Sequence, residues 1–353
     1  MEIKISKTTL KRAKPNQDVL GFGNYFSDHM FVMDYTLESG WHNPQIVPYQ
    51  NIPVDPASMV LHYGQAVFEG MKAYASADGR TLLFRPRKNM ERLNVSNDRL
   101  CIPPIDADFC VDALKCLVNC ERDWVPTAPN TSLYLRPFIF ATDPFLGVRP
   151  SNTYKFMIIC SPCGAYYAEG INPVSIYVEP KYVRAVKGGV GFAKTEANYA
   201  ASLKAQQEAK DKGFSQVLWL DGKERKYIEE VGTMNVFFVI DGEVITPMLE
   251  GSILPGITRS STIDLLRDKG YAVTERKLSI EEVYAAHAAG RLNEAFGTGT
   301  AAVISPIGAL SYNDEVIKIN NGETGKISAE VYDTLTGIQC GHLEDKFGWV
   351  VEV

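Results

Sequence analysis

The chain has 353 residues, of which 45% are hydrophobic and 22% are charged, a composition typical of a globular protein with more than one domain. Its formal net charge of −6 and pI near 5.5 argue against a nucleic-acid partner. No segment approaches the roughly 20 apolar residues that a membrane helix requires, so we expect no membrane association.

The N-terminal segment and the cysteines indicate the cellular compartment. Met1–Lys7 lacks the apolar run of a signal peptide and contains an acidic residue, so we expect no targeting peptide. Seven cysteines, an odd number without regular spacing, are typical of a reducing compartment, and we expect a cytoplasmic protein. Cys160 and Cys163 have the spacing of a redox motif, but they end a strand-like run, and we interpret both as buried and unreactive.

The N-terminal part mixes strands and helices. A helix is predicted from Arg87 to Leu100, and Pro103-Pro104 ends it. Asp106 or Asp108 is expected to cap a second helix. Strands are predicted at residues 81–84, 132–140 and 154–160.

Between the last two strands, residues 143–148 form an apolar loop tip that carries Phe145, Leu146 and Val148. Exposed apolar side chains on a loop indicate docking, for example onto a second subunit. The alternative is a tip that folds back onto its own domain, and the residues alone leave both open. Residues 164–173 are predicted to connect an N-terminal domain (1–163) to a C-terminal domain (174–353).

The C-terminal part also combines helices and strands, without a regular βαβ alternation. Each predicted helix ends at a glycine, and Ser279 with Glu282 forms a capping box at the start of the third. The predicted helices are 195–212, 258–269 and 280–289, and the predicted strands are 174–178, 216–220, 236–240 and 244–246. Gly297-Thr298-Gly299 lacks the third glycine of a dinucleotide-binding fingerprint.

One lysine follows a glycine-rich stretch, Gly188–Lys194, that allows the backbone to pass close to a bulky group. A lysine in such a place can form a Schiff base with an aldehyde. Taken alone, the pattern favours a surface lysine after a glycine turn. Lys181, Arg184 and Lys187 just before it are interpreted as a solvated basic face.

Two further charged positions allow two interpretations. Glu230 enters the apolar strand-like segment 228–231, and a buried carboxylate is costly unless it is paired. Glu229 fits a solvent-exposed glutamate at a strand end better. Arg92, on its own, would be a solvated helix arginine. The segment Pro255–Thr258 opens a helix whose free N–H groups favour an anion.

Several of these segments, in this order and spacing, resemble the branched-chain amino acid aminotransferases, which are fold-type IV pyridoxal phosphate enzymes. The resemblance is carried by Gly188–Lys194, Glu230–Asn235, Gly256–Arg259 and Gly297–Ala302, together with Phe68–Lys72, Asn89–Leu93 and Tyr134–Pro137. It implies a mixed α/β (α+β) fold with two domains, a smaller N-terminal one and a larger C-terminal one, and the cofactor in the cleft between them.

The resemblance implies a role for each matching residue toward pyridoxal 5′-phosphate. Lys194 would be the Schiff-base lysine and proton shuttle, and Glu230 would face the pyridine nitrogen. Tyr199 would hydrogen-bond the cofactor's 3′-oxygen. The phosphate would be held by Ile257, Thr258, Thr300 and Arg92. No metal ion is expected.

The resemblance also implies a substrate site for branched amino acids. Side-chain pocket residues would be Phe26, Tyr63, Phe68, Tyr166 and, from the other subunit of a homodimer, Val148. Tyr134 and Arg136 would orient the carboxylate end and help to accept 2-oxoglutarate, and Thr233, Thr300 and Ala301 would hold the α-carboxylate. Taken alone, Phe26, Phe68 and Val148 would be interpreted as plain core residues, as most such residues are.

The implied reaction is a ping-pong transfer of the amino group between L-leucine, L-isoleucine or L-valine and 2-oxoglutarate, which gives branched 2-oxo acids and glutamate. Some family members carry a cysteine pair after the Gly-Thr-Ala turn, but these positions are Ala302 and Ser305 here, so we expect no thiol switch. The alternatives are a D-amino acid transaminase or aminodeoxychorismate lyase, a pyridoxal phosphate carrier without turnover, and a nucleotide-binding protein.

Overall fold

The structure is a computed structural model that describes residues 1–164 and 171–353. Its residues divide into two compact units. The first contains the described residues up to 164 together with Ala193–Glu196 and Gly337–Val353, and the second contains 171–192 and Ala197–Thr336. Tyr166 and most of the predicted connection 164–173 lie outside the described residues.

The first unit is built on a nine-stranded sheet in which almost all neighbours are antiparallel. Its longest pairing joins β7 and β8, from Ser132↔Cys163 to Ala141↔Tyr154. The strand order is β1-β3-β2-β8-β7-β5-β6-β18, with β4 paired to β7. The strands are β1 (Lys4–Ile5), β2 (His29–Thr36), β3 (Gly40–Pro48), β4 (Ala66–Phe68), β5 (Met71–Ala75), β6 (Thr81–Phe84), β7 (Ser132–Ala141), β8 (Thr153–Cys163) and β18 (Val350–Glu352).

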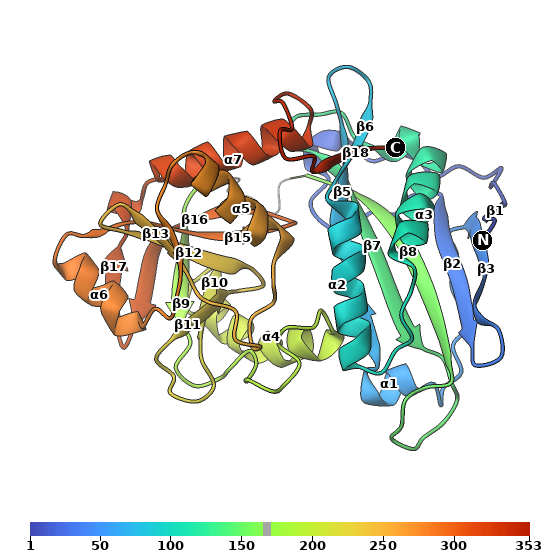
Figure 1. Ribbon diagram of the computed structural model, residues 1–353, viewed down its shortest axis with the longest axis horizontal. Helices are drawn as coiled ribbons and strands as arrows, with labels where there is room; N and C mark the ends of the chain where they lie inside the picture. Colours follow the sequence, from blue (N-terminus) through green and yellow to red (C-terminus); the bar gives the residue numbers. More distant parts are fainter. Residues whose placement is uncertain (165–170) are drawn as a thin grey trace. The chain divides into compact units, whose positions relative to one another are not determined.

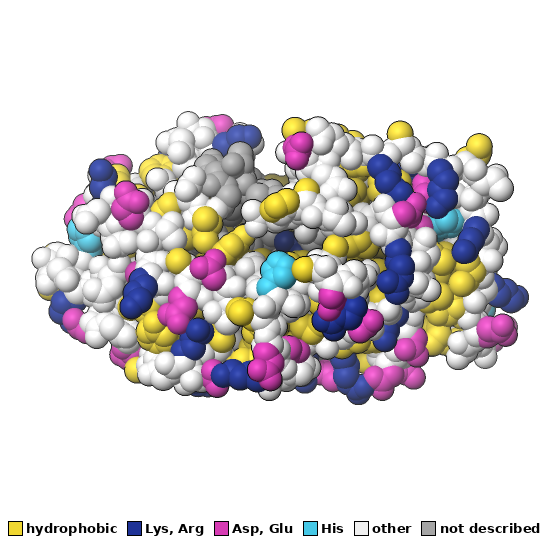
Figure 2. Space-filling view, turned by 90° about the horizontal axis from the view of Figure 1, so that it is seen from above, with side chains coloured by type: hydrophobic (Ala, Val, Ile, Leu, Met, Phe, Trp, Pro, Cys, Tyr) yellow, Lys and Arg dark blue, Asp and Glu magenta, His cyan; other side chains and the backbone are white. Residues whose placement is uncertain are grey.

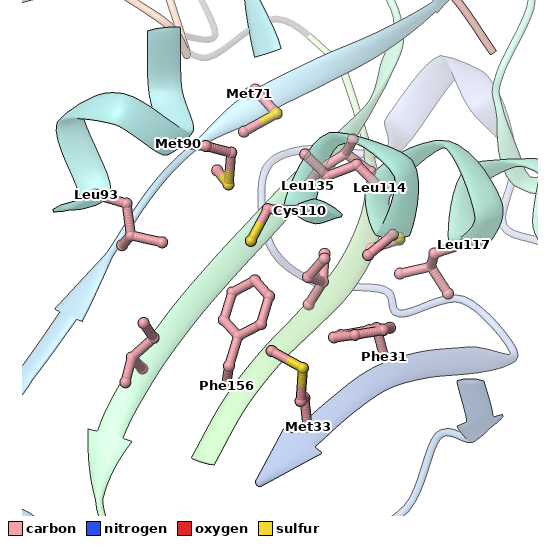
Figure 3. Packing of buried hydrophobic residues seen from close by; sticks show 14 of the residues in the cluster. Phe31, Met33, Met71, Met90, Leu93, Cys110, Leu114, Leu117, Leu135 and Phe156 are labelled. Atoms are coloured by element: carbon pink, nitrogen blue, oxygen red, sulfur yellow. The ribbon is translucent and has the colours of Figure 1, made fainter. Parts of the chain in front are cut away.

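Helices α2 (Pro86–Arg99) and α3 (Ala107–Cys120) cover one face of this sheet (Figure 1). Asp106 caps α3, because its side chain accepts hydrogen bonds from the backbone N–H groups of Asp108 and Phe109. The apolar sides of the two helices point at the strands (Figure 3), and each large side chain buried in this way stabilises the fold by roughly 1.5–3 kcal/mol. The labelled side chains are Met90 and Leu93 of α2, Cys110, Leu114 and Leu117 of α3, and Phe31, Met33, Met71, Leu135 and Phe156 of the sheet.

Shorter elements complete the first unit. They are helix α1 (Met59–Tyr63) and the single 3₁₀ turns at Gln17–Val19 and Arg122–Trp124. The loop tip at 143–148 exposes its apolar side chains: Phe145, Leu146 and Val148 are 43%, 63% and 85% exposed. The core interpretation of Val148 is therefore wrong.

The second unit contains a mixed nine-stranded sheet. The order is β11-β10-β9-β16-β15-β12-β13-β14, with β17 paired to β16, and β9 is parallel to both of its neighbours. This confirms the irregular mixture of α and β. The strands are β9 (Val174–Val178), β10 (Gln216–Leu220), β11 (Ile228–Val231), β12 (Asn235–Ile240), β13 (Glu243–Thr246), β14 (Val273–Glu275), β15 (Leu292–Gly299), β16 (Val303–Tyr312) and β17 (Glu315–Lys318).

The helices of this part are α4 (Glu196–Asp211), α5 (Ile257–Asp268), α6 (Ile280–Ala288) and α7 (Lys326–Gln339), with a 3₁₀ turn at Asn320–Gly322. Gly213, Gly270 and Gly290 follow α4, α5 and α6 with φ of +87°, +85° and +69°, as the C-terminal glycines predict. Ser279 accepts the Glu282 N–H at the start of α6.

Charges of both signs are interspersed on the face shown in Figure 2, in keeping with the small net charge. Among the residues that the structure describes, no helix combines the length and the apolar character that crossing a membrane needs. Cys160 and Cys163 are both buried in β8, as expected, and burial raises the pKa of the Cys160 thiol.

Candidate active site

Lys194 is held in the first unit by its backbone. Its N–H donates to Ser96 Oγ at 2.8 Å, and its carbonyl accepts the Phe68 N–H at 3.0 Å. The next residue, Thr195, forms a β-bridge with Val67 and donates from its hydroxyl to the Ala66 carbonyl at 2.8 Å. The lysine is therefore attached on both sides to β4 and α2, which fixes the origin of its side chain.

The side chain of Lys194 lies next to three of the predicted substrate residues. Its Nζ is 4.8 Å from the centre of the Phe68 ring, and the Arg136 guanidinium is 4.6 Å from the same ring. Arg136 Nη2 donates to the Tyr134 hydroxyl at 3.0 Å. A Cβ on Gly70 would lie 2.0 Å from that hydroxyl, so only glycine leaves room for Tyr134 there. The structure thus brings Lys194, Phe68, Tyr134 and Arg136 together.

Glu69 and Arg92 form a buried ion pair beside this cluster. Arg92 Nε lies 2.8 Å from Glu69 Oε1, and Nη2 donates to Oε2 at 2.9 Å. Burial opposes ionisation of Glu69, but the charges of Arg92 and Lys194 and the hydrogen bonds of Arg92 and Asn89 outweigh it, so the pKa of Glu69 is below its ordinary value. Arg92 is 8% exposed, which corrects its interpretation as a solvated arginine.

We expect Glu69→Gln to lower the free energy of unfolding by about 3–5 kcal/mol, because it leaves the buried Arg92 charge without its counter-ion. Urea unfolding monitored by circular dichroism measures this change. The matched control is Glu91→Gln on the exposed side of α2, where the ion pairs with Arg87 and Lys88 are worth at most about 1 kcal/mol. Equal losses of stability in the two variants would contradict the interpretation of Glu69 and Arg92 as a buried ion pair.

Two other predicted substrate residues of the first unit, Phe26 and Tyr63, have neighbours outside the Lys194 cluster. The Phe26 ring stacks on Tyr49 at 5.3 Å. Tyr63 is 43% exposed, and its hydroxyl donates to the Leu146 carbonyl, so it contacts the loop tip that carries Val148.

In the second unit, Glu230 is the centre of a buried polar cluster. It lies in β11 and is 2% exposed. Its Oε2 lies 2.8 Å from Arg184 Nε, and its Oε1 accepts the Leu254 N–H at 2.7 Å. Arg184 is 8% exposed, so its assignment to a solvated basic face was wrong. Buried charges need such pairing, and the partner here comes from a distant part of the sequence.

Glu230 faces a small pocket that also contains two other predicted residues, Tyr199 and Thr233. The pocket is lined by Arg184, Asn198, Tyr199, Ser202, Glu230, Gly232, Thr233 and Leu254. Tyr199 and Ser202 come from α4 and Thr233 from the turn between β11 and β12, so two separate elements converge on the carboxylate.

The N-terminus of α5 lies close to this cluster. Asn235 Nδ2 donates to the Leu254 carbonyl at 2.9 Å, and a Cβ on Gly256 would lie 2.0 Å from Asn235 Oδ1, so the segment before the helix is packed tightly. The N-cap residue is Gly256, which has no side chain that could cap the helix. Its first N–H groups, at Ile257 and Thr258, are therefore a suitable anion site.

Thr300 and Ala301 form the turn between β15 and β16. Asn235, at the start of β12, pairs with Thr298, near the end of β15. This turn and the turn that carries Thr233 therefore lie at the same end of two neighbouring strands. Gly299 packs against Met234, since a Cβ there would lie 3.1 Å from Met234 Cγ. The second unit therefore gathers Glu230, Tyr199, Thr233, Thr300, Ala301 and the α5 N-terminus.

Glu69 and Arg184 were not among the predicted site residues. Glu69 lies within the Phe68–Lys72 motif, which was a usable signal, whereas Arg184 lies in a cluster of basic residues that looks like surface. Glu229 is also buried, at 6% exposure, which corrects its interpretation as a solvent-facing glutamate.

The sequence and the structure of this chain were compared with those of known proteins, and the family match, the relatives and the solved structure all indicate the same kind of enzyme. Residues 66–310 match the family described as amino-transferase class IV. Branched-chain-amino-acid aminotransferase 2 of Bacillus subtilis is 63% identical over 99% of this chain and 97% of its own length, and branched-chain-amino-acid transaminase 1 of the same strain is 55% identical over 99% of both. The branched-chain amino acid aminotransferase of Escherichia coli superposes with a TM-score of 0.78 at 31% identity, covering 92% of this chain and 98% of that one.

Proposed function

This chain belongs to the branched-chain amino acid aminotransferases of the class IV family, and from that membership we propose which of its residues carry the reaction. The enzyme transfers the amino group between L-leucine, L-isoleucine or L-valine and 2-oxoglutarate, and its cofactor is pyridoxal 5′-phosphate. A solved structure of another branched-chain amino acid aminotransferase, 27% identical to this chain, contains pyridoxamine 5′-phosphate, the form of the cofactor that carries the transferred nitrogen.

The donor set of the chain fits this cofactor. A protonated pyridine nitrogen needs a buried carboxylate, and Glu230 is one. A phosphate needs N–H groups and a cation; we propose that the N-terminus of α5, whose N-cap is a glycine, supplies the first, and that Arg92 and Thr300 are further ligands. We propose Tyr199 as the hydrogen-bond partner of the ring oxygen, because it lines the same pocket as Glu230.

Pyridoxal 5′-phosphate, when bound, supplies an electrophilic aldehyde carbon and a ring that withdraws electrons from the substrate's α-carbon. We propose that the Lys194 amine holds that aldehyde carbon covalently in the resting enzyme. The same amine would be the group that takes the proton from the substrate's α-carbon and returns it. Glu230, paired with Arg184, would hold the ring nitrogen of the cofactor.

The observation that carries the assignment of Lys194 is its environment: a backbone fixed between β4 and α2, and an amine above the Phe68 ring beside Arg136 and Tyr134. The test is borohydride reduction of the holoenzyme followed by peptide mapping. We expect the pyridoxyl group on Lys194, and an adduct on another lysine would overturn the assignment. A cofactor carrier without turnover would be reduced in the same way, but its spectrum would not respond to L-leucine.

We propose that Phe68 and Tyr63 contribute to the apolar wall of the side-chain pocket, which favours branched aliphatic side chains by desolvation. Such a wall separates Leu, Ile and Val poorly, because one methylene is worth roughly 1–3 kcal/mol. Arg136, whose Nε has no hydrogen-bond partner among the described residues, is proposed to bind the second carboxylate of 2-oxoglutarate, which L-leucine lacks.

We expect Arg136→Met to lower kcat/KM for 2-oxoglutarate by about 10- to 100-fold, because a hydrogen bond to a charged group is worth roughly 1.5–3 kcal/mol. The effect on L-leucine should be smaller, since its side chain is apolar. Separate stopped-flow measurements of the two half-reactions give both values, with Arg291→Met as the control, because Arg291 pairs with Asp241 at an exposed site of the second unit instead. Equal losses of kcat/KM for L-leucine and 2-oxoglutarate would exclude a preferential role of Arg136 in binding 2-oxoglutarate.

We also propose that the enzyme is a cytoplasmic homodimer. The exposed Leu146 and Val148 support a dimer in which the loop tip docks onto the second subunit. All seven cysteines are free, as is typical of proteins from a reducing compartment. Light scattering of the wild type and of Leu146→Asp tests the dimer: the variant should shift toward the monomer, and a monomeric wild type would refute the proposal.

A further inference from the structure

Glu229 is a buried carboxylic acid that the reaction above does not use. It precedes Glu230 in β11, at the point where the pairing with β10 shifts register: Trp219 pairs with Glu230 and Leu220 with Ile228, so Glu229 is the extra residue of an irregular pairing. Glu230 lines the small pocket with Tyr199, whereas Glu229 lines a separate cavity of about 480 Å³ in the same unit. Glu229 Oε2 is buried without a hydrogen-bond partner among the described residues.

Ser252 connects Glu229 to the Arg184–Glu230 pair. Its hydroxyl donates to Glu229 Oε1, and its carbonyl accepts a hydrogen bond from Arg184 Nη1 at 2.8 Å. Arg184 in turn pairs through Nε with Glu230 Oε2 at 2.8 Å. One serine therefore contacts Glu229 with its side chain and Arg184 with its backbone.

The surroundings of Ser252 leave it little freedom. A Cβ on Gly191 would lie 2.1 Å from the Ser252 carbonyl oxygen, so the glycine-rich backbone is packed directly against it. Arg184 also donates to the Gly191 carbonyl, from Nη1 at 3.3 Å and from Nη2 at 3.2 Å. A shift of Ser252 must consequently move Arg184, whose orientation sets the geometry of the ion pair.

We propose that Glu229 is a positioning residue for the cofactor acid: its carboxyl accepts the Ser252 hydroxyl and anchors Ser252, whose carbonyl holds Arg184 in the orientation that pairs with Glu230. This inference rests on the proposed role of Glu230 toward the cofactor ring. Glu229 itself touches neither substrate nor cofactor.

Burial is the main reason that the pKa of Glu229 lies above that of an ordinary glutamate. Burial raises its pKa to about 7; the Ser252 hydrogen bond and the charge of Arg184 oppose the rise, and the charges of Glu230 and Asp221 add to it. The other charged groups around the cavity are Lys187, Lys223, Lys277, Glu224 and Glu250. Ionised Glu229 would carry a charge beside Glu230 and compete with it for Arg184.

The sign of the pH effect follows from this pKa. The folded enzyme holds the Glu229 proton to a higher pH than the unfolded chain does. The contribution of this proton to the free energy of unfolding is therefore complete below about pH 4.5 and is lost as the pH rises through about 7. Cofactor binding by the apoenzyme should also weaken as the pH rises through about 7, because ionised Glu229 attracts Arg184 away from Glu230; the titration of the cofactor itself adds to this.

The test compares Glu229→Gln, which stays neutral and keeps a hydrogen-bond acceptor, with Glu229→Ala, which removes it. The readout is the dissociation constant of pyridoxal 5′-phosphate for each apoenzyme between pH 5.5 and 9, with kcat/KM for L-leucine as a second profile. Glu224→Gln is the control, because Glu224 lines the same cavity but is exposed.

We expect Glu229→Ala to weaken cofactor binding by about 10-fold at pH 6.5, the loss of roughly one hydrogen bond. Glu229→Gln should bind as wild type at pH 6.5 and more tightly than wild type at pH 8.5. The Glu224→Gln profile should follow the wild type throughout. Parallel profiles of wild type and Glu229→Gln over the whole range would overturn the proposal.

Two further variants keep the test decisive. If Glu229→Ala does not fold, Ser252→Ala removes the same hydrogen bond and keeps the backbone carbonyl, and it should give the same loss. Glu230→Gln distinguishes a failure of the proposed role of Glu230 from a failure of the proposed role of Glu229. A Glu230→Gln enzyme with normal turnover would refute the proposed function of Glu230, whereas a defective one beside normal Glu229 variants would refute only the positioning role.

Discussion

Lys194→Ala should lower kcat for transamination of L-leucine by at least about 10³-fold, because proton transfer by a positioned side chain alone contributes roughly 10²–10⁴-fold. The substitution also removes the amine that would hold the cofactor's aldehyde carbon. The backbone contacts of residue 194 with Ser96 and Phe68 do not involve its side chain, so the protein should fold. A coupled assay for glutamate formation measures the loss.

Two controls distinguish a catalytic role of Lys194 from a structural one. Lys204→Ala removes a lysine that is 67% exposed on α4 and should leave kcat unchanged. Small primary amines at high concentration should restore part of the activity of Lys194→Ala, since they can carry the missing proton. An enzyme that keeps more than a tenth of wild-type kcat after the substitution would exclude Lys194 from the reaction.

Glu230→Gln is expected to have the second-largest effect, a fall in kcat/KM of about 10²–10³-fold, comparable to removing one preorganised electrostatic partner. The neutral amide can still accept the Leu254 N–H, but it can neither pair with Arg184 nor keep a pyridine nitrogen protonated. Steady-state kinetics with L-leucine and 2-oxoglutarate checks the size of the fall.

The free energy of unfolding of Glu230→Gln must be measured together with its kinetics, because the substitution also leaves the Arg184 charge buried without its counter-ion. Arg184→Lys provides the comparison: it keeps a positive charge near Glu230 but loses the fork of hydrogen bonds to Ser252 and Gly191. We expect its activity to lie between wild type and Glu230→Gln. Full activity of Glu230→Gln at unchanged cofactor affinity would refute the role of the acid.

Local sequence patterns predicted many of the elements closely. The strands at 81–84, 174–178 and 216–220 have the predicted bounds, because each is a short apolar run between turn residues. Asp106, Gly213 and Ser279 end or begin helices through contacts with near neighbours in sequence. By contrast, β2 and β3 were not predicted; Asn43 adopts a φ of +57°, and a register shift after Val32 interrupts the alternation.

The chain by itself determined its family, its main helices and strands, and the residue types that a pyridoxal phosphate enzyme requires, because these depend on motifs and on contacts between neighbours in sequence. Which charged side chains are buried was decided only by the tertiary structure. Arg184 and Glu229 look like surface residues in the sequence, and both are buried because Glu230 and Ser252 come from other segments to meet them. The free energy of a charge depends on its solvation and on its partners, and both are set by how distant segments pack.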